Sequence, residues 1–257
     1  MTRNPPGPDV DPLAPLRARP AEAAVVLDFD GTLSPIVDVP AEARPAPGAV
    51  EALAALVGHL GLVAVMSGRP VDFLAPQLPP GVVLSGLYGL EVVRDGRRTD
   101  HPGAGAWREV VADVARVSTD RGPAGMHVEP KGLSLTLHFR TRPDLADEVR
   151  AWAEGQAARS GLEVRDAKMS VELHPPLPAD KGTALEALAG GMAAVAYVGD
   201  DRGDLPAYDA LDRMAGSGAA AIRVAVAGAE SPPELLARAD LVLDGPGAVV
   251  DLLRALR

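Results

Sequence analysis

The chain has 257 residues, of which 47% are hydrophobic and 23% charged, so it can bury a sizeable core in one large domain or two smaller ones. Its formal net charge of -10 disfavours nucleic acid as a partner, because binding to a phosphate backbone requires a basic surface. The absence of cysteine excludes disulfides, thiolate catalysis and cysteine-ligated metals.

The first twenty residues are rich in proline and show little apolar pattern, so we expect a disordered leader over 1–20. They lack the apolar centre of a signal peptide, and no apolar run elsewhere is long enough to span a membrane. A cytoplasmic protein with no membrane partner is therefore expected, and we expect it to be a monomer.

After the leader, an apolar run ends in two carboxylates one residue apart, where residues 25–33 read VVLDFDGTL. Such a run is typical of a buried strand in a parallel sheet, and open α/β sheets bind ligands beyond the carboxyl ends of their strands. Asp28 and Asp30 would repel each other there unless a cation lies nearby, which favours a divalent metal such as Mg²⁺. The alternative is a strand-terminating turn with solvated carboxylates.

Short apolar segments alternate with helical patterns in the first and last parts of the chain. Pro47 opens one helical pattern that Gly58 closes, and Asp180 is a suitable N-cap for another that Gly190 ends. Strand, helix and strand in this order predict an α/β fold with a parallel sheet. The expected strands are 25–27, 62–66, 82–84, 194–198, 222–226 and 241–243.

The middle of the chain has a different pattern, in which each of two helices is followed by two strands joined by a short turn. This predicts an α+β module, over 101–177, inserted into a parallel core made of 21–100 and 178–257. The expected helices lie near 107–117 and 145–158, and the expected strand pairs are 126–129 with 133–139 and 162–165 with 169–173.

Three further polar groups lie at strand ends or at a helix start. Ser67, Gly68 and Arg69 follow one strand, Lys181 lies in the first turn of a helix, and residues 199–204 read GDDRGD after another strand. Taken singly, these are a common turn, a solvated lysine and an acidic loop. Their order along the chain, after the acid pair, makes coincidence the weaker explanation.

This order resembles the four motifs of the haloacid-dehalogenase-like superfamily, most of whose members are Mg²⁺-dependent phosphohydrolases. The resemblance implies a Rossmann-like core with an inserted cap of the αββαββ, or C2, type. It also implies that Asp28 is a nucleophile that forms an aspartyl-phosphate and that Asp30 is the general acid and base. The implied metal ligands are Asp28, Asp30 through its carbonyl, and Asp200, with Asp201 and Asp204 ligating through water or orienting the others. Thr32, Ser67 and Lys181 would hold the phosphoryl oxygens.

Flanking segments narrow the family, because the chain resembles trehalose-6-phosphate phosphatases along most of its length. The matching segments are 28–36, 67–69, 86–91, 128–132, 138–140, 171–175, 180–182 and 199–201. The cap of that family carries a Glu-x-Lys and a later Glu that grip sugar hydroxyls. The implied substrate contacts are Glu129, Lys131 and Glu172, with Gly68, Arg69 and Arg140. Two positions depart from the family pattern: Tyr88 replaces a frequent histidine and Gly203 a frequent threonine.

Ordinary explanations remain for the insert residues. Glu129 and Lys131 flank a hairpin turn, where exposed charges are common, and Glu172 alternates with apolar neighbours as a residue on a solvated face does. His138 could be a buried imidazole with a partner inside the protein, and Arg140 a surface charge.

The resemblance implies hydrolysis of trehalose 6-phosphate to trehalose and phosphate. Sucrose phosphate and mannosyl phosphoglycerate are alternative substrates, because the motifs are shared among phosphosugar phosphatases. A third hypothesis is a non-catalytic, phosphosugar-binding subunit that regulates a trehalose synthase. It is disfavoured because Asp28, Asp30, Lys181 and Asp200 are all retained.

Overall fold

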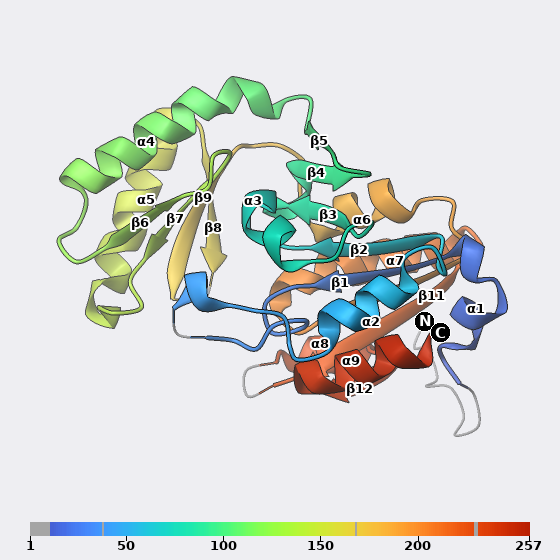
Figure 1. Cartoon of the computed structure of the whole chain (residues 1–257). Helices are drawn as coiled ribbons and strands as arrows, with labels where there is room; N and C mark the ends of the chain where they lie inside the picture. The colour runs from blue at the N-terminus through green and yellow to red at the C-terminus, as the bar shows by residue number, and fades with distance from the viewer. Residues whose placement is uncertain (1–10, 38, 168, 229–230) are drawn as a thin grey trace. The chain divides into compact units, whose positions relative to one another are not determined.

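The structure, a computed structural model shown in Figure 1, describes residues 11–37, 39–167, 169–228 and 231–257. The chain divides into two compact units. We call Met1–Thr99 with Ala179–Arg257 the core unit, and Asp100–Pro178 the insert. The sequence led us to expect the core over 21–100 and 178–257 and the insert over 101–177.

The core sheet has eight strands, and its first six in spatial order are parallel to one another. All six strands expected from the sequence are present, so the α/β prediction is confirmed. In spatial order the strands are β12 (Leu241–Asp244), β11 (Ala220–Ala227), β10 (Ala194–Gly199), β1 (Ala23–Asp28), β2 (Leu62–Met66), β3 (Val83–Gly86), β4 (Glu91–Arg94) and β5 (Arg97–Asp100).

Helices cover both faces of this sheet (Figure 1), because each central strand is apolar on both sides. On β1, Val25 and Leu27 face one apolar cluster, and Ala24 and Val26 face the other. The first cluster includes residues of α1 (Ala14–Ala18), α2 (Ala49–Leu56), α3 (Val71–Leu74) and α9 (Gly245–Ala255). The second includes residues of α6 (Lys181–Ala189), α7 (Leu205–Gly216) and α8 (Pro233–Arg238).

Two expectations about the core unit were wrong or incomplete. Residues 1–10 of the expected disordered leader lie outside the described residues, but α1 forms within 11–20 because Leu13 and Leu16 are buried in the core. The antiparallel strands β4 and β5 were not expected, because β5 is polar and exposed and carries no apolar run. A local signal was present in the sequence, because the dipeptide Asp95-Gly96 is typical of a tight hairpin turn. In the structure both residues have the positive φ angles of such a turn.

The insert contains α4 (Arg108–Arg121), β6 (His127–Pro130), β7 (Leu135–His138), α5 (Ala146–Ser160), β8 (Glu163–Ala167) and β9 (Ser170–His174). This is the αββαββ order that the sequence predicted. The strands form an antiparallel sheet in the order β6-β7-β9-β8. Apolar residues on one face of the sheet pack with α4 and α5, which leaves the polar residues of each strand on the opposite face.

Short 3₁₀ turns complete the described chain. They are Pro20–Glu22, Pro40–Glu42, Ala75–Gln77, Leu87–Gly89, Ala104–Trp107, Pro143–Leu145 and Arg202–Asp204. Within the described ranges, none of the helices combines the length and the apolar character needed to cross a membrane.

Candidate active site

The polar strand ends meet at one edge of the core sheet. Asp28 is the last residue of β1, which lies between β2 and β10, while Ser67 follows β2 and Asp200 follows β10. From β1 the chain continues to β2 on one side, and β10 to β12 fill the other side. This is the topological switch point at which open α/β sheets place their ligands.

Two glycines allow the chain to pass close to the acidic side chains. A Cβ on Gly31 would lie 2.0 Å from Oδ2 of Asp200, and the residue has a φ of +79° that favours glycine. A Cβ on Gly199 would lie 2.3 Å from Cγ of Asp204. These glycines are therefore required so that the carboxylates can converge.

Lys181 lies at the centre of the site because α6 begins there. The Asp180 side chain accepts a hydrogen bond of 2.7 Å from the backbone N–H of Thr183, which caps the helix. The buried Lys181 Nζ lies 2.9 Å from Oδ1 of Asp28 and 2.6 Å from Oδ1 of Asp204. Burial lowers the pKa of Lys181, but the two carboxylates outweigh it and hold this pKa well above the ordinary value. The lysine is therefore a cation.

Asp204 accepts four hydrogen bonds. Its Oδ1 accepts from Lys181 Nζ and, at 2.6 Å, from the hydroxyl of Tyr197. Its Oδ2 accepts from the backbone N–H groups of Asp200 and Asp201 at 2.9 and 3.0 Å. A carboxylate offers about four lone pairs, so these donors occupy all of them. Asp204 is fully buried, and this bonding explains how an acid is tolerated there.

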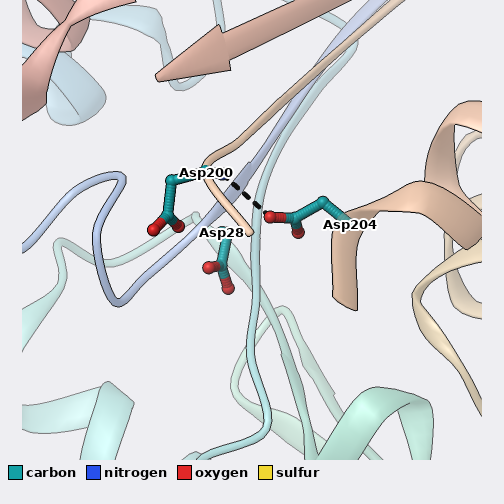
Figure 2. Close-up of side chains that lie close together, drawn as sticks. All are labelled: Asp28, Asp200 and Asp204. Atoms are coloured by element: carbon teal, nitrogen blue, oxygen red, sulfur yellow. Dashed lines mark hydrogen bonds between the residues drawn. The ribbon is translucent and has the colours of Figure 1, made fainter. Parts of the chain in front are cut away.

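Three carboxylates form a group that could hold a metal ion. Oxygen atoms of Asp28, Asp200 and Asp204 all lie within 4.8 Å of one another (Figure 2). Burial raises the pKa of Asp28 well above its ordinary value, which Lys181 opposes in part and Asp204 and Asp200 reinforce. Burial, Asp204 and Asp201 raise the pKa of Asp200 to about 7. Crowded carboxylates with raised pKa values fit a hard divalent cation such as Mg²⁺.

The raised pKa of Asp200 predicts a pH-dependent stabilisation by Mg²⁺. In the metal-free protein, folding raises the pKa of Asp200 from 3.8 to about 7. The contribution of Asp200 to the free energy of unfolding is therefore present below about pH 4 and is lost as the pH rises through 7. Mg²⁺ binds the ionised form, so we expect it to raise the Tm more at about pH 8 than at about pH 5.5. Stabilisation at a hundredfold excess over Kd is about 2.7 kcal/mol.

Differential scanning calorimetry with and without Mg²⁺ at both pH values measures this effect. The Asp200→Asn variant is the control, because its neutral amide does not titrate and offers the metal no negatively charged oxygen. It should lose most of the Mg²⁺-induced shift and its pH dependence. An equal shift in the variant and the parent protein would remove Asp200 from the metal site.

The Asp30 carboxylate is turned toward Arg69. Arg69 donates from Nε to Oδ2 at 2.7 Å and from Nη2 to Oδ1 at 2.8 Å, a bidentate pair with fixed geometry. The guanidinium also stacks on the ring of Phe73, with its carbon 4.2 Å from the ring centroid. Arg69 was predicted to contact substrate, and that role stays a prediction; in this structure it orients Asp30.

The predicted phosphoryl-binding groups lie around the acid cluster. Thr32 is buried and donates to Oδ1 of Asp200 at 3.3 Å. The Ser67 hydroxyl accepts the backbone N–H of Arg69 at 3.1 Å, which leaves its own proton available to a ligand. Gly68 follows it, and a Cβ there would lie 2.5 Å from the Tyr88 hydroxyl.

The insert brings its own predicted site residues to the polar face of its sheet. Glu129 Oε2 lies 2.8 Å from His138 Nε2. Glu172 Oε1 accepts from the Ser134 hydroxyl at 2.7 Å and lies 3.9 Å from Lys131 Nζ. Glu172 is 2% exposed, so it is not the solvated strand residue of the simple alternative. Arg140 follows β7 and has a buried Nε with no hydrogen-bond partner among the described residues.

Sequence reasoning missed two residues that hold predicted ones in place: Tyr197 holds Asp204, and Ser134 holds Glu172. His138, for which an internal partner was one of the expectations, lies 2.8 Å from Glu129. For Tyr197 a signal existed, since a tyrosine stands in an otherwise aliphatic buried strand just before the acidic loop. Ser134 carried no such signal, because its partner is on another strand.

Comparison with protein families identifies the chain. The model of the family described as trehalose-phosphatase matches residues 26–234, a span that contains every predicted motif. The chain therefore belongs to the trehalose-phosphatase family. Its core follows the haloacid-dehalogenase-like fold, as the sequence predicted.

Relatives of this trehalose-phosphatase family member agree with the match. The trehalose-phosphate phosphatase of Mycobacterium avium is 36% identical over 200 residues, which is 73% of this chain and 51% of the relative. The chain thus spans about half the length of this relative and of the trehalose-phosphate phosphatase of Mycobacterium leprae, which it also matches.

Two solved structures show the same fold. The C-terminal domain of trehalose-6-phosphate phosphatase from C. albicans has a TM-score of 0.76 and 23% identity, and the match covers 99% of each chain. A trehalose-6-phosphate phosphatase related protein has a TM-score of 0.78 and 22% identity, with 91% of this chain and 96% of that chain covered.

Proposed function

We propose that this protein hydrolyses trehalose 6-phosphate to trehalose and phosphate, with Asp28 as the nucleophile. The observation that carries the proposal is the position of Lys181, whose ammonium bridges Asp28 and Asp204 at the switch point of the sheet. A carboxylate held by a fixed cation at this edge is poised for attack on an anionic phosphoryl group. Membership of the trehalose-phosphatase family supports the substrate.

In the first step, an oxygen of Asp28 attacks phosphorus and the bond from phosphorus to the sugar oxygen breaks. The sugar oxygen leaves with a proton from the Asp30 carboxyl, and Asp28 carries the phosphoryl group. Lys181 and Ser67 donate hydrogen bonds to phosphoryl oxygens as charge spreads over them, and Thr32 does so once its hydroxyl turns from Oδ1 of Asp200. In this structure both oxygens of Asp30 accept from Arg69, so the bidentate pair opens at one oxygen for Asp30 to carry the proton that it gives to the sugar oxygen.

In the second step, water attacks the phosphoryl group on Asp28 and gives a proton to the Asp30 carboxylate. The bond from phosphorus to the Asp28 oxygen breaks, so that inorganic phosphate leaves and both acids return to their starting states. Mg²⁺, when bound, supplies positive charge that cancels repulsion between the phosphoryl group and the acids.

We assign the metal ligands within the acid cluster on their free lone pairs. Asp28 and Asp200 each retain lone pairs after their hydrogen bonds, whereas Asp204 has none left. Asp28 and Asp200 would therefore hold Mg²⁺, together with the carbonyl of Asp30 that the family resemblance implies. Asp204 would anchor Lys181, and Asp201 would act through water.

The insert would bind the sugar. Glu129 and Glu172 accept hydrogen bonds from vicinal hydroxyls, and Lys131 donates them. Their convergence on one face of the insert sheet supports this role. We also propose that the enzyme is cytoplasmic and monomeric.

Phosphate release from a panel of phosphosugars tests the proposal. We expect the highest kcat/KM for trehalose 6-phosphate, ahead of sucrose phosphate, mannosyl phosphoglycerate and glucose 6-phosphate, and we expect a chelator to abolish release. Preference for another phosphosugar would change the substrate but keep the chemistry. No release from any member with Mg²⁺ present would instead favour a regulatory, phosphosugar-binding protein.

A further inference from the structure

A row of four residues crosses all four strands on the polar face of the insert sheet. Glu129 of β6 lies opposite Thr136 of β7, Thr136 lies opposite Glu172 of β9, and Glu172 lies opposite Arg165 of β8. Cβ atoms of such opposed residues are about 4.5–5.5 Å apart. Thr136 therefore stands between the two carboxylates that the proposed function assigns to the sugar.

The direction of the Thr136 side chain follows from its strand. Leu135 and Leu137 pack in the apolar cluster of the insert with residues of α4 and α5. Side chains alternate along a strand, so Thr136 points to the opposite, polar face. It belongs to the same face as Glu129 and Glu172.

The Thr136 hydroxyl is buried and unpaired. The residue is 3% exposed, and its Oγ1 has no hydrogen-bond partner among the residues that the structure describes. The contrast with Ser134 is direct, because that hydroxyl, buried beside it, donates to Glu172 at 2.7 Å. The hydroxyls of Ser85 and Tyr208 are also buried without a partner among the described residues, but Thr136 stands between Glu129 and Glu172, and this position points to a partner outside the chain.

We propose that Thr136 is a specificity-determining residue that hydrogen-bonds a hydroxyl of the bound sugar. The inference rests on the proposed function, since Glu129 and Glu172 mark this face as the sugar-binding one. Ionised carboxylates only accept hydrogen bonds. A sugar hydroxyl that donates a hydrogen bond to one of them still has free lone pairs on its oxygen. The Thr136 hydroxyl can donate to such an oxygen.

Binding at Thr136 requires a small movement, because Oγ1 is closed to solvent in this structure. Glu129, which lies opposite Thr136, would have to turn from His138 as the sugar arrives.

Kinetics of Thr136→Val and Thr136→Ser test the proposal, because valine has the shape of threonine without the hydroxyl and serine keeps it. For trehalose 6-phosphate we expect Thr136→Val to raise KM about five- to tenfold, the fold-change of one neutral hydrogen bond, and Thr136→Ser to restore it within about twofold. Activity on para-nitrophenyl phosphate, which has no sugar, should stay within about twofold of the parent protein in both variants.

Two controls separate this role from a structural one. Thr119→Val removes a hydroxyl that donates to its own helix at 2.9 Å, and it should leave KM unchanged. Urea unfolding should show that Thr136→Val is as stable as the parent protein or more stable, because it removes an unpaired polar group.

An unchanged KM in Thr136→Val would overturn the proposal, and so would a lowered stability together with equal losses on both substrates. If the parent protein does not act on trehalose 6-phosphate, the proposed function fails instead. The same variants are then tested on whichever phosphosugar of the panel is hydrolysed, with the same expected rise in KM.

Discussion

Asp28→Asn should abolish phosphate release from trehalose 6-phosphate, with a fall in kcat of about 10⁴- to 10⁶-fold, as for the loss of other catalytic nucleophiles. An amide oxygen is a poor nucleophile and cannot form the acyl phosphate. Steady-state phosphate release measures the loss. In acid-quenched reactions with radiolabelled substrate, the parent protein should carry hydroxylamine-labile phosphate and the variant none.

The same substitution should not destabilise the metal-free protein, because Lys181 keeps its pair with Asp204. The raised pKa of Asp28 means that its ionised form is disfavoured by burial in the fold. Its contribution to stability is therefore present below about pH 4 and lost as the pH rises, so Asp28→Asn should be at least as stable as the parent protein at about pH 8. The two proteins should converge in stability near pH 4.

A control on the surface of the core unit distinguishes these effects from a general response to charge removal. Asp251→Asn on α9 removes an exposed acid whose side chain is 78% accessible, and it should change neither kcat nor stability appreciably. Normal kcat in Asp28→Asn would remove Asp28 as the nucleophile. A strongly lowered stability of Asp28→Asn at about pH 8 would contradict its electrostatic environment.

The strand-end logic explains why much of the core site could be predicted from sequence. Parallel strands β1, β2 and β10 each end at the same edge, so the residues that follow them must meet there whatever the details of packing. The convergence of Asp28, Ser67 and Asp200 at one edge of the sheet was predicted for this reason. Lys181 was found because an N-cap fixes where its helix begins.

Contacts between distant segments could not be predicted in the same way. The bidentate pair of Asp30 with Arg69 joins residues 39 apart in the chain, and the bond of Ser134 to Glu172 joins residues 38 apart. No local period encodes such pairs, because they depend on rotamers and on strand register. Helix α1 was missed for a related reason: its short apolar pattern is stabilised by the core it packs against.

Lys181→Met should reduce both activity and stability. Methionine preserves the length of the side chain but leaves Asp28 and Asp204 without their shared cation, and breaking a buried ion pair of this kind costs about 3–5 kcal/mol. Lys181 lowers the pKa of Asp28, so its removal raises that pKa further. The destabilisation should therefore be largest at alkaline pH and shrink as the pH falls and Asp28 protonates.

Urea unfolding of Lys181→Met from about pH 5 to about pH 9 measures this effect, and two further variants locate its cause. Lys131→Met removes a half-buried lysine of the insert whose Nζ lies 3.9 Å from Glu172, and it should cost at most about 1 kcal/mol. Lys181→Met combined with Asp204→Asn should regain part of the lost stability at alkaline pH, because one of the two uncompensated charges is gone. Strict additivity of the two substitutions would show that Lys181 and Asp204 do not act as a pair. The anchoring role given to Asp204 would then be wrong.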